Sequence, residues 1–341
     1  MKIEVYSPTI RRKEMDAVLT AMVEEKIGPG ERCKFLIQTV KEQICFDYAL
    51  ALRSPVVAFH FALKALNAKP GQAVIISVLS PRYCIQALEA LQLKPLFCDV
   101  SFDFPCISSG GVEKLIAGSD VCAIVAHHTL GFIPDTSAIL EFGIPVIEDI
   151  SQSYGSWFLA EKEKEETPLK GKLFILGLEE RDMLTSGGGA LLFAMNRGDG
   201  SLLRNFSNLP GEYCLPDINA ALAITQFREI YRNLQKRNEI ARIYLKSSLR
   251  TRHKRFVPLT DYNNYSFPLV LEAGLKDVVA YAKKKEIAVE NAFENTAAAA
   301  RPCKDCPVGN SLSLRTVVFP MHPGLHSAEV ERVSKLIMTL P

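Results

Sequence analysis

Apolar residues follow two different spacings between residues 50 and 200. Short continuous apolar runs, typical of strands buried on both faces of a sheet, alternate with segments whose apolar residues recur with helical spacing. The runs predict strands at 73–77, 94–100, 121–128 and 145–150, with two more inside 173–194. The helical spacing predicts helices at 56–68, 82–93, 112–120 and 135–142. This alternation predicts an α/β fold with a parallel or mixed sheet covered by helices.

The pattern changes after residue 214. The long amphipathic segment 215–249, with an aspartate near its start, predicts one connecting helix. Beyond it lie a predicted strand at 265–271, predicted helices at 274–287 and 327–340, and a poorly patterned stretch at 290–312. We therefore expect a large domain of residues 1–229 and a smaller C-terminal domain of residues 230–341.

Charge and composition narrow the function classes. A net charge of +2 gives no support for nucleic acid or an anionic membrane as a partner. No segment approaches the roughly 20 apolar residues that cross a bilayer, and the N-terminus lacks the apolar run of a secretory signal. We expect a cytoplasmic protein.

The nine cysteines lie mostly in apolar contexts, which favours reduced, buried thiols. Only Cys303 and Cys306 form a close pair. A zinc ribbon needs a second pair, and a redox pair normally opens a helix in a thioredoxin-like unit, so a loop with two thiols is the favoured interpretation. No metal site is expected.

The turn between the two strands of 173–194 is rich in charge and is followed by a triple glycine. It contains Glu179, Glu180, Arg181 and Asp182. A turn between two rigid strands is a place where an enzyme can present a reactive side chain, yet this turn has an arginine and no lysine.

Several phrases, in their order and spacing, resemble one enzyme family along almost the whole chain. They are the segments 28–52, 62–100, 125–139, 145–158, 215–230 and 317–333. Together they resemble the DegT/StrS-type (DegT/DnrJ/EryC/StrS) sugar aminotransferases, which are pyridoxal-phosphate enzymes. The resemblance implies the aspartate-aminotransferase-like α/β fold, PLP fold type I, with a mostly parallel seven-stranded sheet and a smaller C-terminal α/β domain. It also implies a homodimer and a role in sugar or polysaccharide biosynthesis.

The resemblance places the family's cofactor lysine at Arg181. Pyridoxal chemistry needs an amine that forms an imine with the cofactor aldehyde and later moves the substrate proton. A guanidinium stays protonated, with a pKa above about 12, and offers no such amine. No lysine occurs between Lys172 and Lys236, and Lys172 precedes the strand. We therefore expect no catalytic residue of the transaminase type.

Other positions that the resemblance assigns to the cofactor have also changed. The phosphate-binding Ser-Gly-Thr is replaced by Ser54, Pro55 and Val56, which removes a hydroxyl and a backbone donor. The remaining changed positions are a phosphate-site serine, an amide from the partner subunit, the ring-stacking aromatic residue and an acidic residue of the glycine motif, which fall at Leu176, Glu212, Pro81 and Gly187. Tyr83 lies close enough to leave the aromatic position open.

Asp149 and Gln152 keep the family's pyridine-nitrogen and ring-hydroxyl positions. We interpret them as remnants of a cofactor site, with a structural or ligand-holding role. Asp149 could cap a helix or pair with an arginine, such as Arg181. His128 also fits its family position, either as a buried hydrogen-bonded residue, which is favoured, or as a catalyst. The expected ligand pocket comprises Ser54, Tyr83, His128, Arg181 and Ser186.

Three hypotheses remain. The favoured one is a non-catalytic family member, without PLP, that binds a nucleotide-sugar or another small anionic ligand through Arg181 or partners an active relative. The second is an active PLP-dependent nucleotide-sugar aminotransferase with a rearranged site. The third is new chemistry in the old pocket, with Glu179, Glu180 or Asp149 as acid or base.

Overall fold

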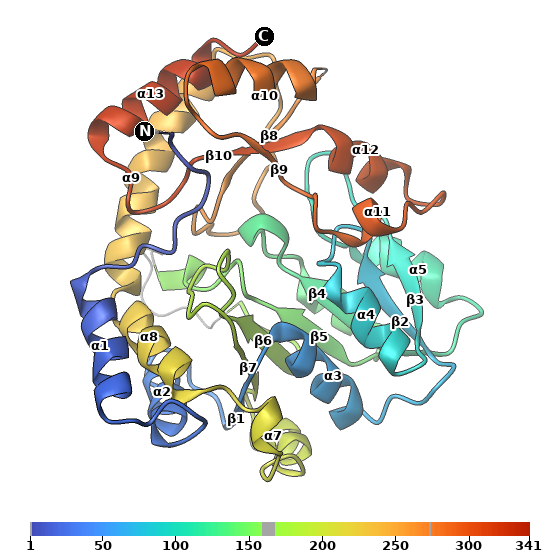
Figure 1. The fold of residues 1–341 in the computed structure, drawn as a ribbon. Coiled ribbons are helices and arrows are strands. Elements are labelled where there is room, and N and C mark those ends of the chain that lie inside the picture. Colours follow the sequence, from blue (N-terminus) through green and yellow to red (C-terminus); the bar gives the residue numbers. More distant parts are fainter. Residues whose placement is uncertain (1, 159–167, 273) are drawn as a thin grey trace.

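Seven strands form the central sheet of the computed structural model, which describes residues 2–158, 168–272 and 274–341. Their order is β1-β7-β6-β5-β4-β2-β3 (Figure 1). β7 runs antiparallel to both neighbours, and all other pairs are parallel, so the predicted mostly parallel seven-stranded sheet is confirmed. The strands are β1 (Tyr48–Leu52), β2 (Ala73–Ser77), β3 (Lys94–Cys98), β4 (Val121–His127), β5 (Val146–Asp149), β6 (Leu173–Gly177) and β7 (Ala190–Ala194).

Successive residues of each central strand enter two different cores. In β6, Leu173 and Ile175 pack in the core that contains α3 (Pro55–Ala65) and α4 (Tyr83–Ala90). Phe174 and Leu176 pack in the core on the opposite face. Both faces of the strand are therefore apolar, which explains its continuous hydrophobic run.

The opposite face is covered by several helices. They are α2 (Glu31–Lys41) and α8 (Asp217–Arg228) over β6 and β7, and α5 (Ser109–Ile116) and α6 (Thr136–Leu140) over β2 and β4. The helices α1 (Arg12–Val23) and α7 (Arg197–Arg204) pack against α8 and β1 respectively. Three short 3-10 turns are η1 (Thr129–Gly131), η2 (Ser156–Phe158) and η3 (Gly211–Tyr213).

The segment predicted as one connecting helix is two helices, and this prediction was wrong. α8 ends at Arg228, and α9 (Ile230–Ser248) begins directly after Glu229. Glu229 has φ −93° and ψ 1°, which leaves the helical region, and its carboxylate pairs with Lys13 of α1 at 2.6 Å. The apolar spacing runs through both helices, so it did not reveal the break.

A second, smaller sheet with strand order β8-β10-β9 forms with the last helices a separate core, drawn at the top of Figure 1. Its strands are β8 (Phe267–Val270), β9 (Glu290–Asn291) and β10 (Thr316–Phe319), and α9, α10 (Leu275–Lys284) and α13 (Ser327–Met338) pack with them. Between β9 and β10 lie α11 (Ala297–Ala300) and α12 (Pro307–Arg315), whose buried residues pack in the cores of the large sheet. Ile3 bridges to Ile287 and joins this core. The domain boundary at 229/230 falls at the break after α8. The boundary stays a prediction, because Ile3, which lies in the segment assigned to the large domain, packs in the core of the second sheet.

No helix in the described parts of the chain is both long and apolar enough to cross a bilayer.

Candidate functional site

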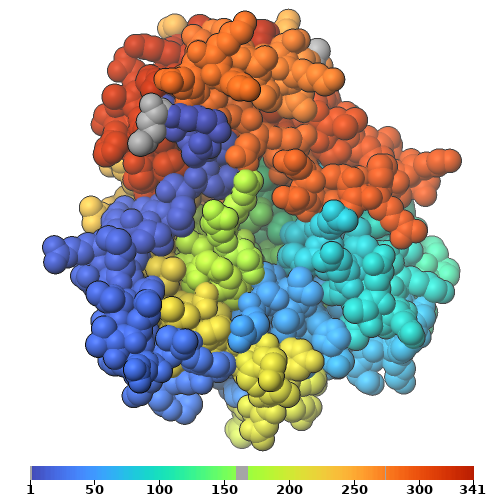
Figure 2. Space-filling model, in the orientation of Figure 1, coloured from blue at the N-terminus to red at the C-terminus, as the bar shows by residue number. Residues whose placement is uncertain are grey.

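A cavity of about 570 Å³ lies where the carboxyl ends of β1, β2, β4, β5 and β6 meet the segment 291–296 and Tyr6. In Figure 2 the surface is hollowed between the yellow-green residues near 180 and the orange residues near 290. The carboxyl ends of parallel strands are where open α/β sheets bind ligands. Of the predicted pocket residues, the cavity brings together Ser54, Tyr83 and Arg181, with Asp149 and Gln152.

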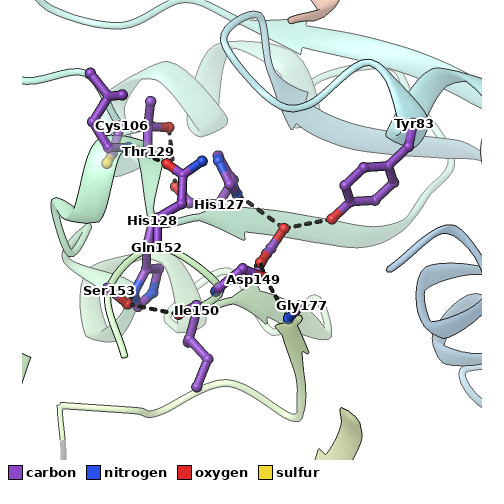
Figure 3. Close-up of polar contacts among 12 residues, drawn as sticks. Tyr83, Cys106, His127, His128, Thr129, Asp149, Ile150, Gln152, Ser153 and Gly177 are labelled. Carbon is purple, nitrogen blue, oxygen red and sulfur yellow. Dashed lines mark hydrogen bonds and ion pairs between the residues drawn. The ribbon is translucent and has the colours of Figure 1, made fainter. Parts of the chain in front are cut away.

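Asp149, the last residue of β5, has both carboxylate oxygens engaged by the protein (Figure 3). Oδ2 accepts a hydrogen bond from the Tyr83 hydroxyl at 2.5 Å. Oδ1 accepts from the Ser151 backbone N–H at 3.1 Å and the Ser151 hydroxyl at 2.5 Å. The Ser151 oxygen in turn accepts from Gly177 N–H at 2.7 Å. Tyr83 therefore occupies the side of Asp149 that faces the cavity.

The protonation states of this pair follow from burial and from each other. Burial alone would raise the pKa of Asp149, but nearby His127 and the hydrogen bonds from Ser151 and Tyr83 hold it below its usual range. Burial, with the adjacent Asp149 carboxylate, raises the pKa of Tyr83 well above its usual value. Asp149 is thus an anion that accepts a hydrogen bond from a neutral phenol.

His127 also lines the cavity, and sequence reasoning missed it in favour of His128. It ends β4, pairs in register with Asp149 of β5, and is only 3% exposed. Its Nδ1 lies 3.1 Å from Asp149 Oδ2, a hydrogen-bond distance without ideal alignment. The available signal was position: both residues end neighbouring parallel strands, which brings them together at one sheet edge.

Gln152 is fixed by a backbone donor. Its Oε1 accepts a hydrogen bond from Leu130 N–H at 2.6 Å. An N–H group can only donate, so the amide oxygen must face Leu130 and the amide nitrogen points elsewhere. Within the described chain, no hydrogen bond engages that nitrogen, and Gln152 lines the cavity.

Arg181 binds Glu290 of β9 and not Asp149, so the suggested Asp149–Arg181 pair is corrected. Its Nη1 lies 2.7 Å from Glu290 Oε2, and its guanidinium lies 5.0 Å from the centre of the Tyr6 ring. Its carbonyl accepts a hydrogen bond from the Tyr265 hydroxyl at 2.6 Å. Burial would lower the pKa of Arg181, but Glu290 raises it above its ordinary value. The guanidinium is a cation already neutralised by a protein carboxylate.

The turn around Arg181 makes this part of the cavity acidic. Glu179, Glu180, Asp182 and Glu294 all line it. Asp182 Oδ2 accepts from Glu179 N–H at 2.8 Å, and burial, with the charges of Asp149 and Glu179, raises the pKa of Asp182 well above its usual value. Burial also raises the pKa of Glu179. Asp182 is therefore harder to ionise than an exposed aspartate.

Three predicted residues have structural contacts of their own. Ser54 is the N-cap of α3, where its hydroxyl accepts from Val57 N–H at 3.3 Å, and it still lines the cavity. His128 is fully buried, with Nδ1 2.6 Å from Ser153 Oγ and Nε2 3.0 Å from Glu148 Oε2. Ser186 donates to the Gly188 carbonyl at 2.7 Å. His128 and Ser186 do not line the cavity, because their side chains are turned into the protein, and this corrects their placement in the pocket.

The close cysteine pair lies at the start of α12. Cys306 is the N-cap residue and is buried, and Cys303 is half-buried; both are free thiols. Within the described residues no group of three or more His, Cys, Asp or Glu side chains is arranged to hold a metal ion.

The family model for the DegT/DnrJ/EryC1/StrS aminotransferase family matches residues 8–164 and 200–338. The unmatched stretch between these ranges contains Arg181 and its turn. A UDP-4-amino-4-deoxy-L-arabinose--oxoglutarate aminotransferase of Shewanella sediminis is 26% identical over 70% of this chain. The chain spans 66% of that relative's length.

Two solved structures share the fold at low identity. The PLP form of the sugar aminotransferase Spr1654 from Streptococcus pneumoniae has a TM-score of 0.87 and 15% identity, with coverage of 99% of this chain and 98% of that one. The GDP-4-keto-6-deoxy-D-mannose-3-dehydratase of E. coli, with bound hydrated PLP, has a TM-score of 0.85 and 14% identity, with 99% of each chain covered. The family-model match over most of the sequence shows that this chain belongs to the DegT/DnrJ/EryC1/StrS aminotransferase family, whose members depend on PLP.

Proposed function

We propose that this chain is a family member that does not transaminate and that keeps the cavity for a sugar ligand, such as the sugar part of a nucleotide-sugar. The single observation that carries the proposal is Arg181 at the lysine position, where its guanidinium is bound to Glu290. A permanently charged guanidinium cannot form the imine that holds PLP. No lysine is among the described residues that line the cavity.

The remaining PLP contacts fit the cofactor poorly. A pyridinium nitrogen needs a free carboxylate oxygen, and the Tyr83 hydroxyl fills that place on Asp149. The phosphate would meet Pro55 and Val56, which offer neither a backbone N–H at the first position nor a hydroxyl at the second. Losing one such contact weakens binding by about 1–3 kcal/mol, and several losses together remove useful affinity.

The cavity itself suits a small polar molecule. Its volume of about 570 Å³ lies within the range of small-molecule sites, and both carboxylates and amides line it. The names of the Shewanella and E. coli relatives both contain nucleotide-linked sugars, which favours that ligand class. Arg181 does not supply the anion contact expected from the sequence, since Glu290 already neutralises it, so the neutral sugar part is the better fit near this residue.

We further propose a homodimer in the cytoplasm. On α1 the apolar residues Met15, Leu19, Met22 and Val23 are each more than half exposed and follow helical spacing. Such a stripe on one helix face is typical of a contact with another protein surface, and a second copy of this chain would cover it. The nine free thiols favour a reducing compartment.

The test is covalent capture of PLP. Protein incubated with PLP is reduced with borohydride and digested, and every modified peptide is identified by mass spectrometry. We expect no imine absorbance band beyond the background of surface lysines and no modified peptide from the cavity. A stoichiometric adduct on one lysine, with glutamate-dependent amination of a keto-sugar, would instead establish an active aminotransferase with a rearranged site.

A further inference from the structure

His127 and Gln152 both line the cavity, and one side-chain nitrogen of each makes no hydrogen bond within the described parts of the chain. Figure 3 shows the His127 ring with one nitrogen toward Asp149 and the other turned away from it, on the side of Gln152. That second nitrogen, Nε2, makes no hydrogen bond in the described parts of the chain, although only 3% of His127 is exposed to solvent. A ring nitrogen without a hydrogen-bond partner, on a side chain that lines a cavity, is a candidate for contact with a ligand.

Asp149 determines which nitrogen of the His127 ring preferentially carries the proton. An anionic carboxylate beside Nδ1 favours the tautomer with the proton on Nδ1, which leaves a lone pair on Nε2. The same carboxylate stabilises the imidazolium that forms when Nε2 accepts a proton. Tyr83 shares Oδ2 and keeps Asp149 in place.

Gln152 supplies the complementary group. Because its oxygen is held by Leu130 N–H, its amide N–H groups are available to an oxygen atom in the cavity. An oriented amide donor is the kind of group that stabilises developing negative charge on a carbonyl oxygen. A base and an oxyanion donor therefore line the same cavity, which has the size of a sugar site.

We propose that His127 and Gln152 carry out proton transfer on a keto-sugar without PLP. His127 Nε2 takes the proton from the carbon next to the carbonyl, and the C–H electron pair forms the carbon–carbon double bond of an enolate. Gln152 donates a hydrogen bond to the enolate oxygen, and the proton returns from the imidazolium to carbon. Atoms and electrons balance with no external oxidant or reductant, and the net result is exchange or isomerisation at that carbon. This inference rests on the proposed function, because PLP in the cavity would occupy the same wall.

The experiment measures deuterium exchange. Protein freed of pyridoxal compounds is mixed with GDP-4-keto-6-deoxy-D-mannose in heavy water, and the deuterium content of the sugar is followed by NMR and mass spectrometry. We expect incorporation next to the carbonyl well above the buffer rate. His127→Asn, which lacks a basic nitrogen, should lower the rate about 100-fold or more, which is the ordinary size of a general-base contribution.

Gln152→Glu is the sharper variant. Its carboxylate can still accept the hydrogen bond from Leu130 N–H, so the local fold is kept while the donor is lost. The exchange rate should fall with the unfolding temperature unchanged. His60→Asn, on α3 outside the cavity lining, is the matched control and should exchange like the unchanged protein.

Exchange at the buffer rate, or exchange that survives His127→Asn, would overturn the inference. Neither result would produce the trapped PLP adduct that overturns the proposed function, so the two failures are distinguishable.

Discussion

Arg181 of the turn after β6 and Glu290 of β9 form an ion pair of 2.7 Å that joins the large sheet to the small one. Arg181, which we propose stands at the position of the family's reactive amine, thus acts as a contact between two parts of the chain. Tyr6 beneath the guanidinium and the Tyr265 hydroxyl on its carbonyl strengthen the same contact.

Replacing Glu290 with glutamine should lower the free energy of unfolding by no more than about 1 kcal/mol, because exposed ion pairs contribute little. The Arg181 side chain is 54% exposed, so water screens the pair. Urea unfolding measures the difference, with Glu286→Gln, which removes the more exposed pair with Arg332, as the control. A loss of several kcal/mol would show that the contact organises the domains more strongly than its exposure implies.

Arg181→Lys alone should not restore a stoichiometric PLP imine. The new amine would face Glu290, and Tyr83 would still cover Asp149. The double change Arg181→Lys with Tyr83→Phe frees one carboxylate oxygen and should give more borohydride-trapped adduct than either single change. Full loading of the single lysine variant would mean that the arginine was the sole obstacle.

Asp182→Asn should stabilise the protein increasingly as the pH rises above about 4, the ordinary pKa of an aspartate in an unfolded chain. Burial and nearby negative charge raise the pKa of Asp182 in the fold, so ionisation costs stability between the unfolded and folded values. The amide oxygen can still accept from Glu179 N–H. Unfolding temperatures at acid and at mildly alkaline pH measure the trend.

Asp149→Asn should change the stability of the protein with pH in the opposite direction. The pKa of Asp149 is lowered in the fold, so its contribution to stability is present above the unfolded pKa and is lost as the pH falls. The asparagine variant should therefore be most destabilised near neutral pH. Identical pH trends for the two variants would contradict the assigned directions.

His128→Leu should destabilise the fold by about 3 kcal/mol or more, because it leaves a buried carboxylate without one of its partners. His128 Nε2 is 3.0 Å from Glu148 Oε2, and both side chains are completely buried. The less disruptive Ser153→Ala removes only the hydroxyl beside Nδ1 and should cost about 1 kcal/mol. A stable His128→Leu protein would point away from a structural role.

Leu19→Asp should shift the protein from dimer to monomer in sedimentation experiments. Leu19 lies in the middle of the exposed stripe of α1, and burying a new charge at an apolar contact is costly. Leu249→Asp, at a leucine after α9 that is more exposed than Leu19, is the control and should leave the oligomeric state unchanged. A monomeric unchanged protein would contradict the dimer directly.

Local spacing predicted the strands β2 to β7 because each is a short apolar run, but it did not single out β1 as a strand. The candidate site could be predicted only in part from the sequence. The family resemblance pointed to Asp149, whereas His127 was overlooked since only strand pairing places it beside Asp149.

Long-range contacts explain other misses. α12 begins in the stretch 290–312 that showed no clear pattern, and its first turn is capped from far away in sequence. Asp99 accepts hydrogen bonds from Val308 N–H at 3.0 Å and Gly309 N–H at 2.7 Å. A cap supplied by a residue some two hundred positions earlier leaves no local signal for the start of the helix.

The bridge between Ile3 and Ile287 has a consequence for the order of folding events. During translation Ile3 is made well before Ile287, its bridge partner. The segment before α1 therefore stays unpaired while the strands of the large sheet are being made. Contacts of such long sequence separation slow folding, and this one makes docking of the segment around Ile3 a late event.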